Sequence, residues 1–323
     1  AGQFHVWSWE FVMGSAGSNT GLDVIFDGQV NTSPNMEVRA DRFAEWAPSA
    51  NQFQIGSYEA VEVWDGPIGE IAVYERDLTP TESQRVNTYF ALKWGSMLDA
   101  DPASATVNFD YAASDGTLIW EGASNAAYQP YHHGVAGIGR DDDSGLVQKQ
   151  SKSVTNGTVV AIYNGDQTGG LPADNASNAS TFAANTSFLL WGHNGTSASF
   201  DVAYTPGAFS PPGGFFHMSR IWKVQETGSV GAVTIHAISS ASYLLVHNSA
   251  DFSSGSPAEI ALTDDGNGNM VATVDLTDGQ YFTFGRESIS PGCVGGGLTA
   301  WYKADVGVTG TTAVSAWADQ SGN

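Results

Sequence analysis

Short apolar segments that alternate with polar residues recur along most of the chain, a pattern typical of β-strands that place one face on a core. In the first 78 residues this pattern predicts four strands, over residues 4–11, 22–26, 53–56 and 68–74. Polar and apolar positions alternate along the last of them, so we expect it to be half buried. Asp27-Gly28, directly after the second strand, predicts a tight hairpin turn.

A longer series of strand signals occupies the middle of the chain. Eight segments rich in β-branched and aromatic residues are expected to be strands, namely residues 117–120, 158–163, 187–191, 220–224, 230–235, 243–246, 270–274 and 280–284. Asx-Gly turn signals are frequent between them. Eight strands are enough for two sheets packed face to face.

Only one segment has the periodicity of a helix. Thr79 is expected to be its N-cap, Pro80 its first residue, and Glu82 the partner of Thr79 in a capping box. Gly95 is expected to end it. Helical spacing places one stripe on a single face, which we interpret as a packing surface: Val86, Tyr89, Phe90, Lys93 and Trp94.

These patterns predict an all-β protein with two β-sandwich units and one short α-helix after the first. We assign residues 1–99 to the first unit with its trailing helix and residues 100–286 to the second. Residues 287–297 are rich in Ser, Pro and Gly and are expected to be a linker. Residues 298–323 are expected to form the opening strands of a further unit, which we interpret as a candidate strand donor.

The net charge of the chain limits the classes of partner that it can bind. A net charge of −22, with only 12 Lys and Arg residues, repels nucleic acid and anionic lipid, so neither is expected as a partner. The chain contains no 18-residue apolar run, so membrane insertion is not expected. Most carboxylates have no basic residue to pair with, which makes calcium a candidate ligand. In the alternative reading, the acidic surface only keeps the protein soluble.

The chain has one cysteine, Cys293, in the expected linker, which excludes an internal disulfide framework. We interpret it as a thiol without a structural role. An interchain disulfide is the alternative.

Two loops could hold calcium. Asp141, Asp142 and Asp143 are adjacent carboxylates that repel one another unless they face water or share a cation. The alternative is a solvated turn capped by aspartate. The second loop places oxygen ligands at nearly alternating positions, Asp264, Asp265, Asn267 and Asn269. It lacks a distal glutamate, and Asn-Gly sequences also form hairpins unaided.

Other residue types give weaker site hypotheses. Trp7 and Trp9 share a strand face, and Trp46 and Trp64 lie near expected loops. They could stack on sugar rings, although core packing is the alternative. His132-His133 is not expected to share a metal, because adjacent side chains on a strand point to opposite faces. The chain lacks Gly-x-Ser-x-Gly, His-Glu-x-x-His and phosphate-loop motifs, so we expect no enzyme activity.

A series of motifs resembles known domains of very large bacterial surface proteins. Residues 69–86 (GEIAVYERDLTPTESQRV) and 89–95 (YFALKWG) resemble the closing strand and trailing helix of laminin-G-like, concanavalin-type jelly rolls. The motifs GIGRDDDSG, FLLWG, RIWKVQETG and DGQYFTFG, at residues 137–145, 188–192, 220–228 and 278–285, resemble the uncharacterised β-domain that follows them. Residues 298–323 resemble the start of another jelly roll.

This resemblance implies an extracellular or cell-surface, repetitive, adhesin-like protein with calcium and glycans as ligands. The first 99 residues resemble the C-terminal part of a jelly roll, and the last 26 resemble its opening strands. We therefore expect the chain to be one stretch of a tandem array that begins and ends inside a domain. In such an array, neighbouring repeats or copies complete each other's sandwiches by strand complementation and so build a fibre. A smaller variant sandwich at the N-terminus is the alternative. A calcium-dependent carbohydrate-binding module is the second functional hypothesis, and a polysaccharide hydrolase the third.

Overall fold

The structure, a computed structural model, describes five short strands between residues 7 and 63 and most of the chain from residue 68 onward. The described ranges are residues 68–98 without 75 and 77, residues 109–287 without 156, 206, 208–214 and 238–239, residue 291, and residues 298–320 without 305–306 and 311–312. The expected fold class is confirmed, because the described residues form antiparallel sheets with one α-helix.

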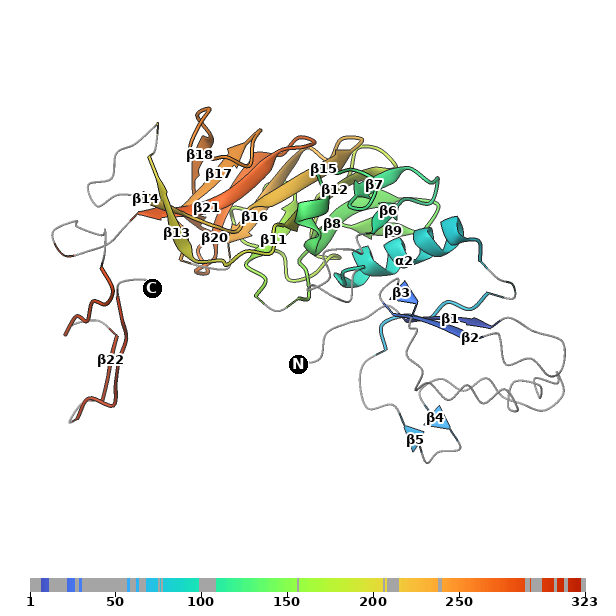
Figure 1. Ribbon diagram of the computed structural model, residues 1–323, viewed down its shortest axis with the longest axis horizontal. Coiled ribbons are helices and arrows are strands. Elements are labelled where there is room, and N and C mark those ends of the chain that lie inside the picture. Colours follow the sequence, from blue (N-terminus) through green and yellow to red (C-terminus); the bar gives the residue numbers. More distant parts are fainter. Residues whose placement is uncertain are drawn as a thin grey trace.

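Two antiparallel sheets form a β-sandwich within residues 133–287 (Figure 1). The larger sheet contains β8 (His133–Asp141), β9 (Leu146–Gln148), β12 (Ser187–His193), β13 (Phe200–Tyr204), β14 (Phe215–Met218), β15 (Trp222–Thr227), β17 (Tyr243–His247), β18 (Ala258–Ala261) and β21 (Tyr281–Glu287). The smaller contains β10 (Gln150–Ser151), β11 (Val160–Asn164), β16 (Ala232–Ala237), β19 (Thr263–Asp264) and β20 (Met270–Asp275).

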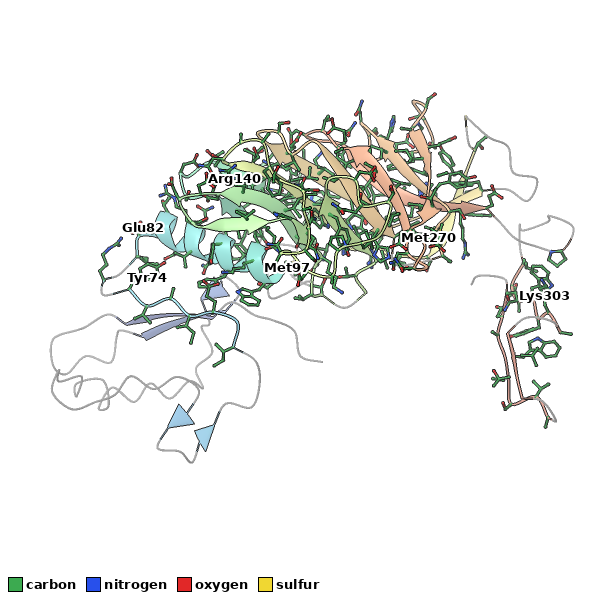
Figure 2. All side chains as sticks on the ribbon, turned by 180° about the vertical axis from the view of Figure 1, so that it is seen from behind. Tyr74, Glu82, Met97, Arg140, Met270 and Lys303 are labelled. Atoms are coloured by element: carbon green, nitrogen blue, oxygen red, sulfur yellow. The ribbon has the colours of Figure 1, made fainter. Side chains whose placement is uncertain are left out.

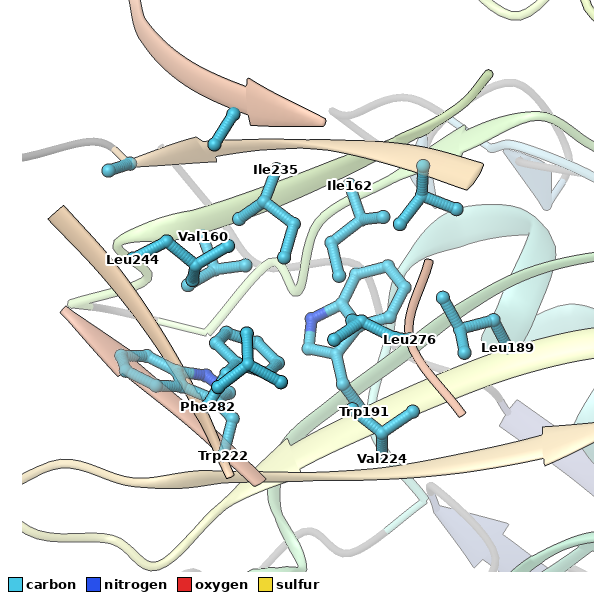
Figure 3. Close-up of a cluster of buried hydrophobic side chains, with 14 of the residues drawn as sticks. Val160, Ile162, Leu189, Trp191, Trp222, Val224, Ile235, Leu244, Leu276 and Phe282 are labelled. Atoms are coloured by element: carbon cyan, nitrogen blue, oxygen red, sulfur yellow. The ribbon is translucent and has the colours of Figure 1, made fainter. Parts of the chain in front are cut away.

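The main core lies between the two sheets (Figure 3). Trp191, Trp222 and Phe282 supply its aromatic centre, and each is at most 2% exposed. The rings of Trp222 and Phe282 are stacked, with centroids 5.3 Å apart. Ile162 and Ile235 of the smaller sheet close the core from the other side. Alternating side chains of both sheets therefore fill one interior, as in other sandwiches.

A second core covers the outer face of the larger sheet. Strand β12 shows the reason, because Leu189 and Trp191 point into the main core while Phe188 and Leu190 belong to the second. The covering elements are α2 (Pro80–Trp94), the hairpin of β6 (Asp110–Ala112) and β7 (Leu118–Glu121), and the short 3-10 turn η1 (Gln129–Tyr131). A strand buried on both faces has a continuous apolar run.

Two glycines of β8 allow this outer layer to approach the sheet. A Cβ atom on Gly137 would lie 2.7 Å from Leu190 Cγ and 2.9 Å from Leu92 Cδ2 of α2. A Cβ atom on Gly139 would overlap the ring of Phe188. Glycine inside a strand marks such close approaches, so the bare outer face of β8 is where the helix rests.

The ends of α2 confirm the prediction. Thr79 is the N-cap with a complete capping box to Glu82, Pro80 is in the first turn, and Gly95 is the C-cap at φ 67°. The predicted packing face is wrong in part, because the residues buried against the sandwich are Asn87, Thr88, Ala91 and Leu92. Small side chains there fit the close approach to β8.

The aromatic stripe of α2 is only half buried and packs against residues 68–74. The indole of Trp94 lies over Gly69, whose Cβ would be 2.8 Å from the ring. The strand predicted for residues 68–74 is also wrong, since this segment has no ladder partner and all its residues are exposed. It follows the helix instead, because Glu70 bonds to Tyr89 and Lys93.

All eight strands predicted for the second unit are present, with ends that differ by at most three residues. The sequence analysis missed the nine-residue strand β8 and several shorter ones, among them β6, β13 and β14. The helix assigned to the first unit packs on the second, through contacts with β6, β8 and β9.

Near the N-terminus the described strands are β1 (Trp7–Phe11), β2 (Leu22–Phe26), β3 (Gln29–Val30), β4 (Ser57–Tyr58) and β5 (Glu62–Val63). Strands β2 and β3 pair at Phe26 and Gln29, as the turn predicted at Asp27-Gly28 requires. The strand predicted over residues 53–56 and the thiol of Cys293 lie outside the described residues.

Residues 298–320 contain a small hairpin of β22 (Val308–Thr309) and β23 (Ala316–Trp317). Trp317 donates its indole N–H to the carbonyl of Lys303 at 2.7 Å, yet stays 45% exposed. Tyr302 and Val314 are more than half exposed. Across the described ranges, none of the helices combines the length and apolar character needed to cross a bilayer.

The close approach of α2 to β8 gives a stability prediction. Gly137→Ala should destabilise the full chain by about 1–3 kcal/mol, because the added methyl must displace Leu92 or Leu190. The matched control is Gly169→Ala, where nothing lies within 4 Å of the added atom. Urea unfolding curves measure both. Equal midpoints for the two variants would contradict the proposed packing.

Candidate functional site

The acidic run at residues 141–143 forms the end of β8 and the turn into β9. Asp141 is buried, and its carboxylate accepts the N–H and hydroxyl of Ser114 at 2.9 and 2.5 Å. Asp142 accepts two hydrogen bonds from the Arg140 guanidinium, both at 2.7 Å, which lowers its pKa. Asp143 is exposed. Two of the three predicted calcium ligands are therefore engaged with different protein groups.

The loop at residues 264–269 is the turn between β19 and β20. The buried Asp265 accepts hydrogen bonds from the N–H groups of Asn267, Asn269 and Leu171 and from the Asn269 amide. These donors, the Asn269 side chain foremost, hold its pKa well below 3.8. Asp264 accepts the N–H groups of Gly266 and Gly268. N–H dipoles thus surround both carboxylates and shape the hairpin.

No group of three or more His, Cys, Asp or Glu residues in the described part of the chain is arranged to hold a metal ion. Calcium therefore stays a prediction that rests on the composition. Of the four predicted sugar-binding tryptophans, Trp7 and Trp9 lie in β1, but their side chains are outside the described residues. Trp46 and Trp64 also lie outside them.

The fold brings together three histidines from distant positions. His132 ends the turn η1, so it does not alternate with His133 as strand neighbours would, and their rings lie 4.1 Å apart. His193 of β12 stacks on His133 at 5.7 Å and accepts the N–H of Gly195 at Nδ1. Burial, and next the charge of Arg220, lower the pKa of His193 to about 3. Burial also lowers the pKa of His133, so these two imidazoles favour the neutral form.

A groove of about 430 Å³ lies between residues 70–78, α2 and the sandwich. Tyr74, Tyr89 and Phe90 line it from the outer side. Buried apolar residues of the second core form its floor, among them Leu146 and Phe188. The size and the apolar floor are those of pockets that hold small ligands.

Charged residues are among those that line this groove. Figure 2 labels one of them, Glu82, at the start of α2. Arg76 binds both carboxylate oxygens of Glu82 at 2.8 and 2.6 Å, which, together with Thr79, lowers the pKa of Glu82 to about 2. Lys93 binds Glu70 at 2.8 Å. Burial raises the pKa of Glu70, but hydrogen bonds from Lys93 and Tyr89 outweigh it and leave that pKa lowered. These pairs hold Glu70 and Arg76 beside the helix.

Sequence reasoning missed this groove, because its walls come from segments that only the tertiary structure brings together. Asp141 and Asp143 are the predicted site residues that line it. The other lining residues had been interpreted as strand or helix positions with no ligand role. The sequence signal for the groove is the basic residue Arg85 on the helix. This signal is weak, because a basic residue on a helix is equally consistent with a charge in contact with solvent.

A family model described as a domain of unknown function (DUF8202) matches residues 82–280, which is more than half of the chain. The chain belongs to this family. The match to DUF8202 begins inside α2 and ends directly before β21, so it includes most of the helix and the groove floor. The helix thus belongs with the sandwich by sequence as well as by packing. The chain matches no curated protein and no solved structure.

The histidine stack predicts an acid-sensitive fold. Because the pKa of His193 falls from 6.5 to about 3 on folding, the unfolded chain takes up the proton first. The stability contribution is complete above about pH 6.5 and is lost as the pH falls toward 3. His193→Asn keeps an acceptor for Gly195 and removes the titration. Between pH 6.5 and 4.5, thermal unfolding should shift less in this variant than in the wild type. Identical shifts would rule out His193 as the sensor.

Proposed function

We propose that the chain is a non-catalytic structural and adhesive module of a large extracellular or cell-surface protein, in which it acts as a spacer. The observation that supports this most is the path of the chain through the sandwich. It enters through α2 at one end and leaves through β21 at the other (Figures 1 and 2). Modules joined in this way continue one another along a line, as in other repeat proteins.

Strand β21, through which the chain leaves the sandwich, is held by ladder partners and buried side chains. Such a strand suits a module that is under tension. Strand β21 pairs with β17 over five residues and with β15 and β14 along its length. Phe282 and Phe284 anchor the same strand in the main core, where both are fully buried. A pull on Glu287 therefore acts on a strand with ladder partners and buried aromatic side chains.

The charge supports an extended array. At a net charge of −22, neighbouring modules repel one another, which keeps an array soluble and separated. Cations such as calcium would screen this repulsion, and this is the role in which calcium stays part of the proposal. Calcium-dependent glycan binding remains the alternative.

Two exposed apolar segments support head-to-tail contact between copies. Residues 68–74 expose Ile68, Ile71 and Val73 at 47, 46 and 62%. The hairpin of residues 298–320 exposes Trp317 and Tyr302. The two segments lie at opposite ends of the molecule, as Tyr74 and Lys303 show in Figure 2. Contact between them in different copies builds an open fibre, because such interfaces do not close on themselves.

The test uses the full chain and a truncation that lacks residues 291–323. Light scattering and small-angle scattering at rising concentration should show the full chain growing in length at constant cross-section. The truncated chain should stay monomeric, because it lacks the hairpin of β22 and β23 that makes the head-to-tail contact. Compact oligomers, or the same oligomers after truncation, would contradict head-to-tail assembly.

A further inference from the structure

We propose that the groove beside α2 is a binding site for a neutral saccharide, with Arg85 as its central hydrogen-bond donor. This inference does not rest on the spacer role. It concerns a site formed by the sandwich and the helix of a single copy, and it requires no metal.

The first step is the state of Arg85, which lines the groove. Its Nε atom is buried and has no hydrogen-bond partner. Within the described ranges its guanidinium also makes no hydrogen bond and no ion pair. A buried N–H group without an acceptor destabilises the folded state, because it has lost its hydrogen bond to water and gained none in return. Such an orphaned donor in a ligand-sized groove indicates that an acceptor from a ligand belongs there.

The second step is the fixed position of this guanidinium. A Cβ atom on Gly116, in the β6–β7 turn, would lie 2.8 Å from Arg85 Nη2. The absence of a side chain at Gly116 therefore leaves room for the guanidinium against the turn. Asp115 accepts the N–H of Thr117 at 2.8 Å and makes no hydrogen bond or ion pair with this guanidinium, although the charge of Arg85 adds to the hydrogen bonds from Thr117 in lowering the pKa of Asp115. Arg76 and Lys93 are paired with Glu82 and Glu70, so among the described cations at the groove Arg85 is the one that can donate to a ligand.

The third step is the chemistry of the ligand. Four carboxylates line the groove, from Glu70, Glu82, Asp141 and Asp143, against the two guanidinium groups of Arg76 and Arg85. A polyanion or an acidic peptide would be repelled there. A neutral molecule with many hydroxyl groups can accept from Arg85 and donate to the exposed carboxylate of Asp143.

The aromatic wall completes the fit. Tyr74 is 48% exposed and lies on the same groove as the half-buried Tyr89 and Phe90. The apolar faces of sugar rings pack on such aromatic surfaces, while their hydroxyl groups reach the polar rim. A volume of about 430 Å³ lies within the range of small-ligand pockets, so the site accommodates a short oligosaccharide segment.

The test uses the full chain with cellotetraose, mannotetraose, laminaritetraose, xylotetraose and trigalacturonate as probes, each with and without EDTA. Titration calorimetry should detect at least one neutral tetrasaccharide, with the same affinity in EDTA, and should not detect trigalacturonate. No binding of any probe, binding of trigalacturonate alone, or binding abolished by EDTA would each overturn the proposal.

Three variants locate the site. Arg85→Leu should weaken binding by about ten- to hundredfold, the loss expected for a hydrogen bond from a charged group. Its melting temperature should be unchanged or raised, because an unpartnered buried donor is removed. Gly116→Ala should also weaken binding, since the new methyl displaces the guanidinium, and its melting temperature is measured as well because the φ of 90° at Gly116 strains alanine. Arg286→Leu, whose guanidinium stacks on Phe200 away from the groove, should bind normally. Full affinity in Arg85→Leu, or a lower melting temperature in that variant, would assign Arg85 a structural role instead.

Discussion

The outer face of β8 carries no side chain at Gly137 and Gly139, and much of this structure depends on that gap. Leu92 of α2 and Phe188 of β12 occupy the space that side chains would take. The larger sheet is consequently buried on both faces where the helix rests, and the helix becomes a third layer of the sandwich. Close packing of this kind tolerates no added methylene without displacement.

The seating of α2 also positions the candidate site. Once Leu92 rests on β8, the first two turns of the helix face the β6–β7 turn and the acidic run at the end of β8. Arg85 then meets the bare backbone at Gly116, and Glu82 meets Arg76 of the preceding segment. The groove lies between this preceding segment, α2 and the sandwich. The match to the DUF8202 family model includes these elements, except for the segment before residue 82.

Local signals in the sequence predicted most of the fold. The ends of α2 followed from Thr79, Glu82 and Gly95, because caps act within one turn. Strands such as β12 and β16 followed from their β-branched and aromatic content. Strand β8 was missed because three glycines in nine residues hide the alternation. Gly137 leaves room for Leu92 of α2 and Gly139 for Phe188 of β12, contacts between distant segments that no local pattern contains.

The candidate site could be predicted much less well, since it depends on contacts between distant residues. The buried face of α2 was misjudged because the larger aromatic side chains dominate the periodicity, while the residues buried against the sandwich are Asn87, Thr88, Ala91 and Leu92. The carboxylates at Asp141 and Asp265 looked like free oxygen ligands. The fold instead supplies N–H and hydroxyl donors from Ser114, Asn267 and Leu171. His193 meets His133 only because β12 pairs with β8.

Hydrogen exchange of the full chain, resolved to single amides, tests the central claim that α2 is an integral layer of the sandwich. If the helix is packed on β8 as described, the amides of its buried face near Leu92 exchange only through global unfolding. They should then share the protection of β8 and β12 and lose it together with them in denaturant. Fast exchange along α2, with β8 and β12 still protected, would show a helix that is merely attached and would contradict the account.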